Sequence, residues 1–146
     1  MAEENHVYTT SVRWESERRG SLTSPGLPDL AVATPPQFPG GHAGIWSPEH
    51  LFVAAAEACL MTTFLAIAEN SKLEYLEYSS VAEGVLEKTD EGFMITRITI
   101  RPRVVITDPS ALERARRIVE KAEQHCLISK SMKTRISLEP DVVVRA

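Results

Sequence analysis

Residues 47–68 read SPEHLFVAAAEACLMTTFLAIA, and this stretch predicts a central helix. Ser47 suits the N-cap position, because its hydroxyl can accept a hydrogen bond from an unpaired backbone N–H of the first turn. Pro48 suits the first helical position, where no N–H is needed, and Glu49 puts negative charge at the positive end of the helix dipole. Apolar residues then occupy nearly every direction around the axis, which is typical of a helix buried by the rest of its protein. Near the middle lies Cys59, one of two cysteines in the chain.

Length and charge restrict the class of protein. A chain of 146 residues is expected to form a single domain, residues 1–146, with enough length for a hydrophobic core. The net charge of −4 gives no electrostatic footprint for nucleic acid or an anionic membrane. Residues 51–68 are long enough to raise the question of a membrane span, but Glu57 in the middle would be costly in a bilayer. The N-terminal sequence MAEEN does not resemble a secretory signal. We therefore expect a cytoplasmic protein with no nucleic-acid or membrane partner.

The remaining elements follow from residue pattern. Strands are predicted over residues 6–14, 20–23, 30–34, 76–88, 93–106 and 135–138, the last extending toward 144. The turn 89–92 joins two of them into a long hairpin. Asp108 and Pro109 start a second helix, amphipathic in its spacing, that ends near residues 124–126. This order of elements predicts an α+β fold with a largely antiparallel sheet around two helices.

The two cysteines are the main candidates for chemistry. Cys59 and Cys126 lie 67 positions apart, which is neither a CxxC motif nor a metal-ligand spacing, and we expect no bound metal. The chain has neither a phosphate-binding loop nor a nucleophile-elbow motif. A cysteine in an apolar helix is often a small packed hydrophobe, and burial raises its pKa unless a positive charge or a donor lowers it. Composition alone leaves the reactive and the inert interpretations of Cys59 open.

Several motifs resemble those of the OsmC/Ohr family. The runs SPEHLF at 47–52 and AAAEACL at 54–60 resemble the family signature at the start of its central helix. Thr34-Pro35 and Gly40-Gly41 resemble the loop before that helix, and HCLISK at 125–130 resembles the motif with the second cysteine. The usual proline after that cysteine is Leu127 here. Together the motifs and the element order cover essentially the whole chain. The resemblance implies the OsmC-like fold, in which a largely antiparallel sheet wraps around two central helices in an intertwined homodimer.

In function, the resemblance implies a thiol-dependent peroxidase that reduces organic hydroperoxides, with hydrogen peroxide as a further substrate. Cys59 matches the peroxidatic cysteine, which would be oxidised to a sulfenic acid, and Cys126 matches the resolving cysteine, which would close a disulfide with it. An external dithiol would reopen the disulfide by exchange, and no bound cofactor is implied. Glu49 matches the glutamate that pairs with an arginine beside the thiolate.

In the Ohr-like branch of the family this arginine comes from an early turn, and in the OsmC-like branch it comes from the loop before the central helix, where residues 35–46 contain none. The resemblance therefore leaves Arg18 and Arg19 as the candidates and the subfamily open. Arg18 matches best and Arg19 lies one place off. A guanidinium near Cys59 would favour the thiolate and could hold a peroxide oxygen. The apolar wall of the substrate site is expected from Phe52, Leu60, Met61 and Phe64.

Glu49 and Cys59 are ten residues apart, or about 15 Å along a straight helix, so they cannot touch within one helix. The family's homodimer, with active sites at the interface, would resolve this distance, and it would also bury one face of an all-apolar helix. A different class stays open from the residues: a non-catalytic dimeric protein on the same fold that binds a small apolar ligand or senses redox state.

Overall fold

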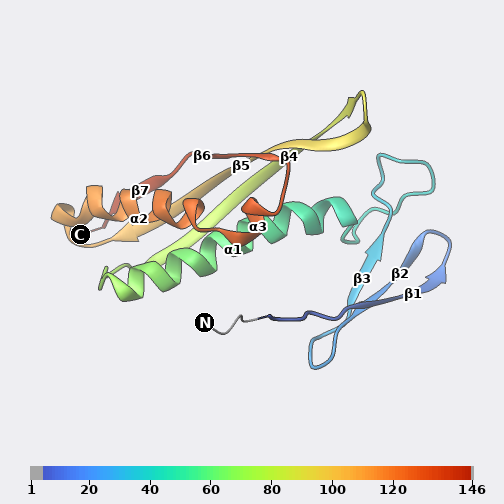
Figure 1. Ribbon diagram of the computed structural model, residues 1–146, viewed down its shortest axis with the longest axis horizontal. Coiled ribbons are helices and arrows are strands. Elements are labelled where there is room, and N and C mark those ends of the chain that lie inside the picture. The colour runs from blue at the N-terminus through green and yellow to red at the C-terminus, as the bar shows by residue number, and fades with distance from the viewer. Residues whose placement is uncertain (1–4, 146) are drawn as a thin grey trace. The chain divides into compact units, whose positions relative to one another are not determined.

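The computed structural model describes residues 5–145, which form two compact units (Figure 1). The first unit ends at Leu51 and the second begins at Phe52, so the division falls inside the predicted central helix. The α+β class is confirmed, with two sheets and two long helices. Each unit has its own sheet.

The first unit contains a three-stranded antiparallel sheet in the order β1-β2-β3. Its strands are β1 (Ser11–Ser16), β2 (Arg19–Thr23) and β3 (Leu30–Ala33). The first strand was predicted over residues 6–14, and the structure shifts it toward the C-terminus. Gly20 sits opposite Trp14 where the strands approach closely, and a Cβ on it would lie 2.3 Å from the Arg13 carbonyl oxygen. Glycine is therefore required at this position.

The central helix, α1 (Pro48–Asn70), begins as predicted and runs two residues further. The Ser47 side chain is buried, and its Oγ accepts a hydrogen bond from the His50 backbone N–H at 3.1 Å. His50 Nδ1 in turn lies 3.3 Å from the Ser47 backbone nitrogen, which donates to it. His50 therefore takes the place of the glutamate or glutamine in a capping box.

The second unit has a four-stranded sheet built around its longest strand. β5 (Gly92–Ile106) pairs with β4 (Glu77–Thr89) in the predicted antiparallel hairpin. On its other edge, β5 pairs in parallel with β6 (Arg135–Leu138) and β7 (Asp141–Val144). The final predicted strand thus divides in two, and Pro140 lies at the division, where it has no N–H for the ladder. Among the described strands, three of the five pairings are antiparallel, so the sheet structure is largely antiparallel as predicted, and these two parallel pairs were not foreseen.

One further helix and two short helical segments complete the described fold. After the 3₁₀ turn η1 (Pro109–Ala111), α2 (Leu112–Gln124) follows the predicted second helix. Asp108 caps the turn, because its Oδ1 accepts from the Ser110 N–H at 2.9 Å. The four-residue helix α3 (Leu127–Lys130) was not predicted.

The core of the second unit lies between its helices and the sheet, and Figure 1 shows α1 running along the β4–β5 hairpin. The sequence predicts burial on every side of α1, but the structure buries one stripe at a spacing of four residues: Ala56, Leu60, Phe64 and Ala68. Their partners on β5 and α2 include Ile98, Ile100, Val104, Ala115 and Val119. The α1 helix is long and apolar enough to cross a membrane, but the core helices of other proteins also meet this criterion of length and composition. Its stripe packs into the core cluster as a core helix does.

Leu60→Ala and Leu76→Ala form a matched pair that tests this packing. Leu60 has no exposed surface, whereas the side chain of Leu76 is 53% exposed. We expect Leu60→Ala to lower the free energy of unfolding by about 2–5 kcal/mol, because it leaves a cavity in the core. Leu76→Ala should cost less than about 1 kcal/mol. Urea unfolding at one fixed protein concentration measures both, and equal losses would contradict the assigned stripe.

Candidate active site

Cys59 lies on α1 directly beside the buried stripe, one residue before Leu60. Its thiol is half-buried, so a small molecule can reach it. Thr63, one turn further along α1, places its Oγ1 3.9 Å from Cys59 Sγ. The helix therefore presents a sulfur at the border between core and solvent, with a hydroxyl beside it.

Four hydrogen bonds act on the Cys59 sulfur. Partial burial is the largest single influence, and alone it would raise the pKa of the thiol. The thiol of Cys126, the hydroxyl of Thr63 and the backbone N–H groups of Leu127 and Ile128 donate to the thiolate and together outweigh burial. The pKa of Cys59 is consequently lowered from its ordinary value, which is the condition for a reactive cysteine.

Cys126 is the neighbour of Cys59 and has the opposite character. It is fully buried at the N-cap of α3. Burial raises the pKa of the Cys126 thiol, and its hydrogen bond to Cys59 raises it further, because that bond requires the proton. The site thus contains one thiol that favours the thiolate and one that keeps its proton.

Ser129 connects Cys126 to a carboxylate. Its Oγ lies 3.3 Å from Cys126 Sγ and 3.3 Å from Glu123 Oε1. Burial raises the pKa of Glu123, and the hydrogen bond from Ser129 opposes that rise. Sequence reasoning assigned neither residue a role, although Ser129 lies within the HCLISK run at 125–130. For Glu123 the only signal was a polar residue three places before a cysteine.

Arg18 and Glu49 line a separate pocket in the first unit, of about 300 Å³. Thr34 and three prolines line it as well, and the Arg18 side chain packs over Gly40, where a Cβ would lie 2.7 Å from its Nε. Glu49 Oε1 is buried and makes no hydrogen bond within residues 5–145. Over the same residues no ion pair joins it to Arg18. The pocket therefore holds an exposed guanidinium and an unsatisfied carboxylate oxygen.

Arg19 does not line this pocket. It is the first residue of β2 and pairs with Ala33 and Ser16 in the sheet. Of the two arginines selected from the sequence, the structure groups only Arg18 with Glu49.

The four predicted substrate-wall residues divide into two pairs. Leu60 and Phe64 are fully buried, and the Phe64 ring packs edge-on against Tyr75 and at a tilt against Tyr78. Both belong to the hydrophobic core of the second unit, so they present no exposed surface to a substrate in the described chain. Phe52 and Met61 are 37% and 38% exposed and remain available to an apolar ligand.

Glu57, the glutamate in the middle of α1, is held by a hydrogen bond. Its Oε2 accepts from the Ser80 hydroxyl of β4 at 2.5 Å. Nearby, the Tyr78 hydroxyl is buried and has no hydrogen-bond partner in the described part of the chain. Burial and the charge of Glu57 raise the pKa of Tyr78, so it stays protonated. This carboxylate ties the helix to the sheet.

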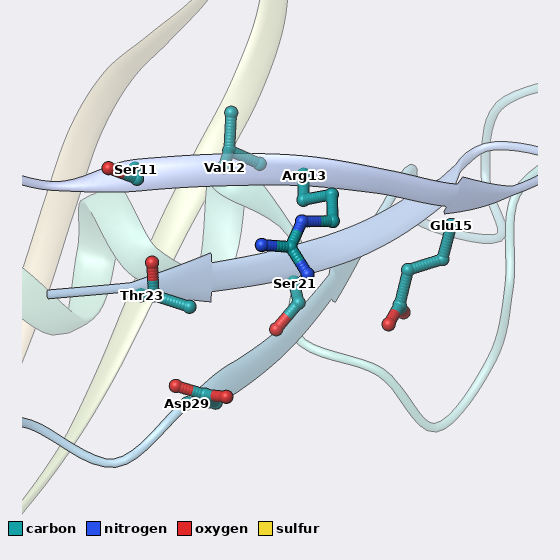
Figure 2. Close-up of a pocket in the computed structure, with 7 residues that line it drawn as sticks. All are labelled: Ser11, Val12, Arg13, Glu15, Ser21, Thr23 and Asp29. Carbon is teal, nitrogen blue, oxygen red and sulfur yellow. The ribbon is translucent and has the colours of Figure 1, made fainter.

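A polar pocket of about 280 Å³ lies on the sheet of the first unit (Figure 2). There the Arg13 side chain extends from β1 across β2, where its cross-strand neighbour is Ser21. The pocket contains no thiol; its lining residues are Ser11, Val12, Arg13, Glu15, Ser21, Thr23 and Asp29. Within residues 5–145 no group of three or more His, Cys, Asp or Glu side chains is placed to hold a metal ion. The cysteine pair is therefore the described constellation best suited to covalent chemistry.

The chain resembles proteins that are named for hydroperoxide resistance. A Staphylococcus saprophyticus protein named organic hydroperoxide resistance protein-like 2 is 30% identical over 143 residues, which cover 94% of this chain and 96% of the relative. Peroxiredoxin OsmC of Escherichia coli K12 is 28% identical over 95 residues, or 64% of each chain. These names suggest a peroxidase-type function.

A solved structure of an OsmC-like protein of unknown function from Vibrio cholerae has the same fold. It superposes with a TM-score of 0.85 at 24% identity and covers 93% of this chain and 99% of its own. The family model described as OsmC-like protein matches residues 41–141, which include both cysteines, Glu49 and Glu123. The chain therefore belongs to the OsmC-like protein family.

Proposed function

We propose that this protein is a thiol-dependent peroxidase that reduces organic hydroperoxides, with Cys59 as the peroxidatic and Cys126 as the resolving cysteine. The observation that carries the proposal is the pairing at Cys59: a half-buried thiol with a lowered pKa lies next to a buried thiol that keeps its proton. A structural cysteine in an apolar core would be expected to have its pKa raised.

In the first step, the Cys59 thiolate attacks the outer oxygen of the hydroperoxide. The O–O bond breaks, the sulfur is oxidised to a sulfenic acid, and the alkoxide leaves and takes a proton to become the alcohol. The thiolate is the nucleophile in such reactions, so the donors around Cys59 increase the reactive fraction near neutral pH.

In the second step, the Cys126 sulfur attacks the Cys59 sulfenic acid. A disulfide forms and water leaves, which prevents further oxidation of Cys59. An external dithiol then reduces the disulfide by exchange and is itself oxidised. No prosthetic group takes part in this cycle, and we place the protein in the cytoplasm, where such dithiols are maintained.

An organic hydroperoxide is the proposed substrate because apolar surface adjoins the thiol. Met61 lies two residues beyond Cys59 on α1 and is partly exposed, as is Phe52. Contact between an apolar side chain and an alkyl group of the substrate removes apolar surface from water, which favours binding. Hydrogen peroxide offers no such group and is expected to be the poorer substrate.

We further propose a homodimer in which the Arg18–Glu49 pocket of one subunit serves Cys59 of the other. Glu49 precedes Cys59 by ten residues on α1, or about 15 Å of helix. Outside its buried stripe, α1 also exposes apolar residues such as Ala58 and Met61, which a second subunit could cover. Arg18 would donate to the peroxide oxygen, and Glu49 would hold its guanidinium in place.

Cys59→Ser tests the function directly. With a dithiol reductant, we expect wild type to consume cumene hydroperoxide faster than hydrogen peroxide, and the variant to lose both activities to the background rate. Mass spectrometry should detect a Cys59–Cys126 disulfide after one equivalent of peroxide. Equal turnover by wild type and variant would contradict the peroxidase proposal and favour a ligand-binding or redox-sensing role.

The pH dependence of Cys59 provides a second test. A lowered pKa means that the thiol loses its proton at a lower pH than an ordinary cysteine. The rate of alkylation by iodoacetamide should therefore increase with pH, with a midpoint at a lower pH than for an ordinary cysteine. Leu127→Pro removes one N–H donor at the first position of α3, where proline is sterically acceptable. It should move the alkylation profile to higher pH, whereas Leu127→Ala, which keeps the N–H, should leave it in place. If both variants give the wild-type profile, this backbone bond does not stabilise the thiolate.

The neighbouring arginines provide a matched pair for the third test. Arg18→Ala should lower kcat/KM for cumene hydroperoxide by roughly 10²-fold, because a donor to the transition-state charge is lost. Arg19→Ala removes the same charge one residue away, outside the Glu49 pocket, and should change kcat/KM by less than about 3-fold. Steady-state kinetics decide between them, and a larger loss in Arg19→Ala would reverse the assignment.

A further inference from the structure

The feature that the two-cysteine cycle leaves unexplained is the carboxylate behind Cys126. Glu123 occupies the last turn of α2 and Ser129 the short helix α3, with Cys126 between them. The Ser129 oxygen lies 3.3 Å from both the sulfur and the carboxylate. Both side chains are half-buried, and Cys126 is fully buried. A continuous path of polar atoms therefore leads from the resolving thiol to an acidic side chain.

Ser129 has one hydroxyl proton and two neighbours that can accept it. When it donates to the Glu123 carboxylate, its oxygen is free to accept the Cys126 S–H proton. When it donates to Cys126, that sulfur must be deprotonated or act as a weak acceptor. Two arrangements of the same atoms thus differ in the position of protons between Cys126 and Glu123. Within residues 5–145, Glu123 has no ion pair, so no basic side chain neutralises it.

We propose that Ser129 and Glu123 form a proton relay that deprotonates Cys126 as it attacks the Cys59 sulfenic acid. This inference rests on the proposed peroxidase function. The Cys126 S–H proton passes to the Ser129 oxygen while the Ser129 hydroxyl proton passes to the Glu123 carboxylate. The new S–S bond forms as the S–O bond of the sulfenic acid breaks, and the departing hydroxide takes a proton from solvent to become water. Glu123 then returns its proton to solvent, so no oxidant or reductant is consumed in this step.

The directions in which the surroundings shift the pKa values of Cys126 and Glu123 agree with these roles. Burial and the hydrogen bond to Cys59 raise the pKa of Cys126, so the resolving thiol is neutral near pH 7 and needs a base. Burial raises the pKa of Glu123 against the effect of Ser129, which makes the carboxylate a stronger base than an exposed one. The side chains that influence these two groups are Cys59 and Ser129 at Cys126, and Ser129 alone at Glu123.

The same proton also explains why the relay acts only after Cys59 has been oxidised. In the reduced protein the Cys126 S–H donates to the Cys59 thiolate and lowers the pKa of Cys59. Oxidation to the sulfenic acid removes that strong acceptor. The S–H can then turn to Ser129, so one proton serves the first step through Cys59 and the second step through Glu123.

The experiment measures how much of the Cys59 sulfenic acid becomes the disulfide and how much is trapped by an added reagent. Reduced protein receives one equivalent of cumene hydroperoxide in the presence of dimedone, which traps the sulfenic acid, and mass spectrometry gives the ratio of disulfide to adduct. This ratio does not depend on how fast the sulfenic acid forms. We expect Glu123→Gln to lower the ratio by roughly 10²-fold, with the rate of Cys59 oxidation unchanged. If wild type fails to react with cumene hydroperoxide, the proposed function fails, and excess hydrogen peroxide is then used to form the sulfenic acid. The ratio of disulfide to adduct still tests the relay, so the two failures remain distinguishable.

Variants separate a proton relay from a merely structural contact. Ser129→Ala should match Glu123→Gln, Ser129→Thr should restore most of the ratio because it keeps the hydroxyl, and the double variant Ser129→Ala/Glu123→Gln should be no worse than either single variant. Glu120→Gln, the same change at an exposed position of α2, is the control and should leave the ratio unchanged.

The pH profile gives the decisive signature. In wild type, disulfide closure should slow as the pH falls and Glu123 becomes protonated. In Glu123→Gln closure should instead depend on hydroxide and rise steadily with pH. Above the pKa of Cys126 the thiolate needs no base, so the variants should converge on wild type. A Glu123→Gln ratio equal to wild type at neutral pH, or a loss that persists at high pH, would overturn the relay.

Discussion

The position of Cys59 depends on the packing of α1 against the sheet. Leu60 belongs to the stripe that enters the core, and successive residues on a helix are turned by about 100°. Cys59 therefore points away from the core by one helical step, toward α3, whose first backbone N–H groups reach its sulfur. A helix rotated by one residue would bury this thiol in apolar surroundings and raise its pKa. Core packing thus sets the chemistry of the site.

The two thiols share one environment but differ in what surrounds their protons. Burial alone pushes both pKa values upward. The difference arises because Cys126 donates to Cys59, and because the unpaired N–H groups at the start of α3 also point to Cys59. Free N–H groups at a helix start are available to an anion, since they have no partner within the helix. Neutral hydrogen-bond donors thus stabilise the Cys59 thiolate, a role for which the sequence suggested an arginine.

Much of the fold could be predicted because its signals are local. Ser47 and Pro48 identify the start of α1, and the alternation in β5 identifies its strand. The buried stripe of α1 could not be chosen from the sequence, because the helix is apolar on all sides and periodicity cannot separate one face from another. The short helix α3 has only four residues, fewer than two turns, so no periodic pattern could reveal it. Long, regular elements were accessible and short connecting ones were not.

The same limit explains which site residues were found. Cys59 and Cys126 are prominent because the chain has only two cysteines, and Glu49 follows a recognisable helix start. Glu123 and Ser129 are common polar residues six positions apart, and only the turn between α2 and α3 brings them to Cys126. A site built from side chains on different elements depends on the fold, so a linear motif records only part of it.

Leu127 shows how a departure from a motif can be physically reasonable. A proline after Cys126 would fit the first position of α3 but would have no N–H. Leucine keeps that N–H, and the bond from Leu127 is one of the four that lower the pKa of Cys59. Its side chain is 66% exposed, so the backbone, and not side-chain packing, is its contribution to the site. The substitution therefore adds a donor to the thiolate at the one position where the usual residue could not supply it.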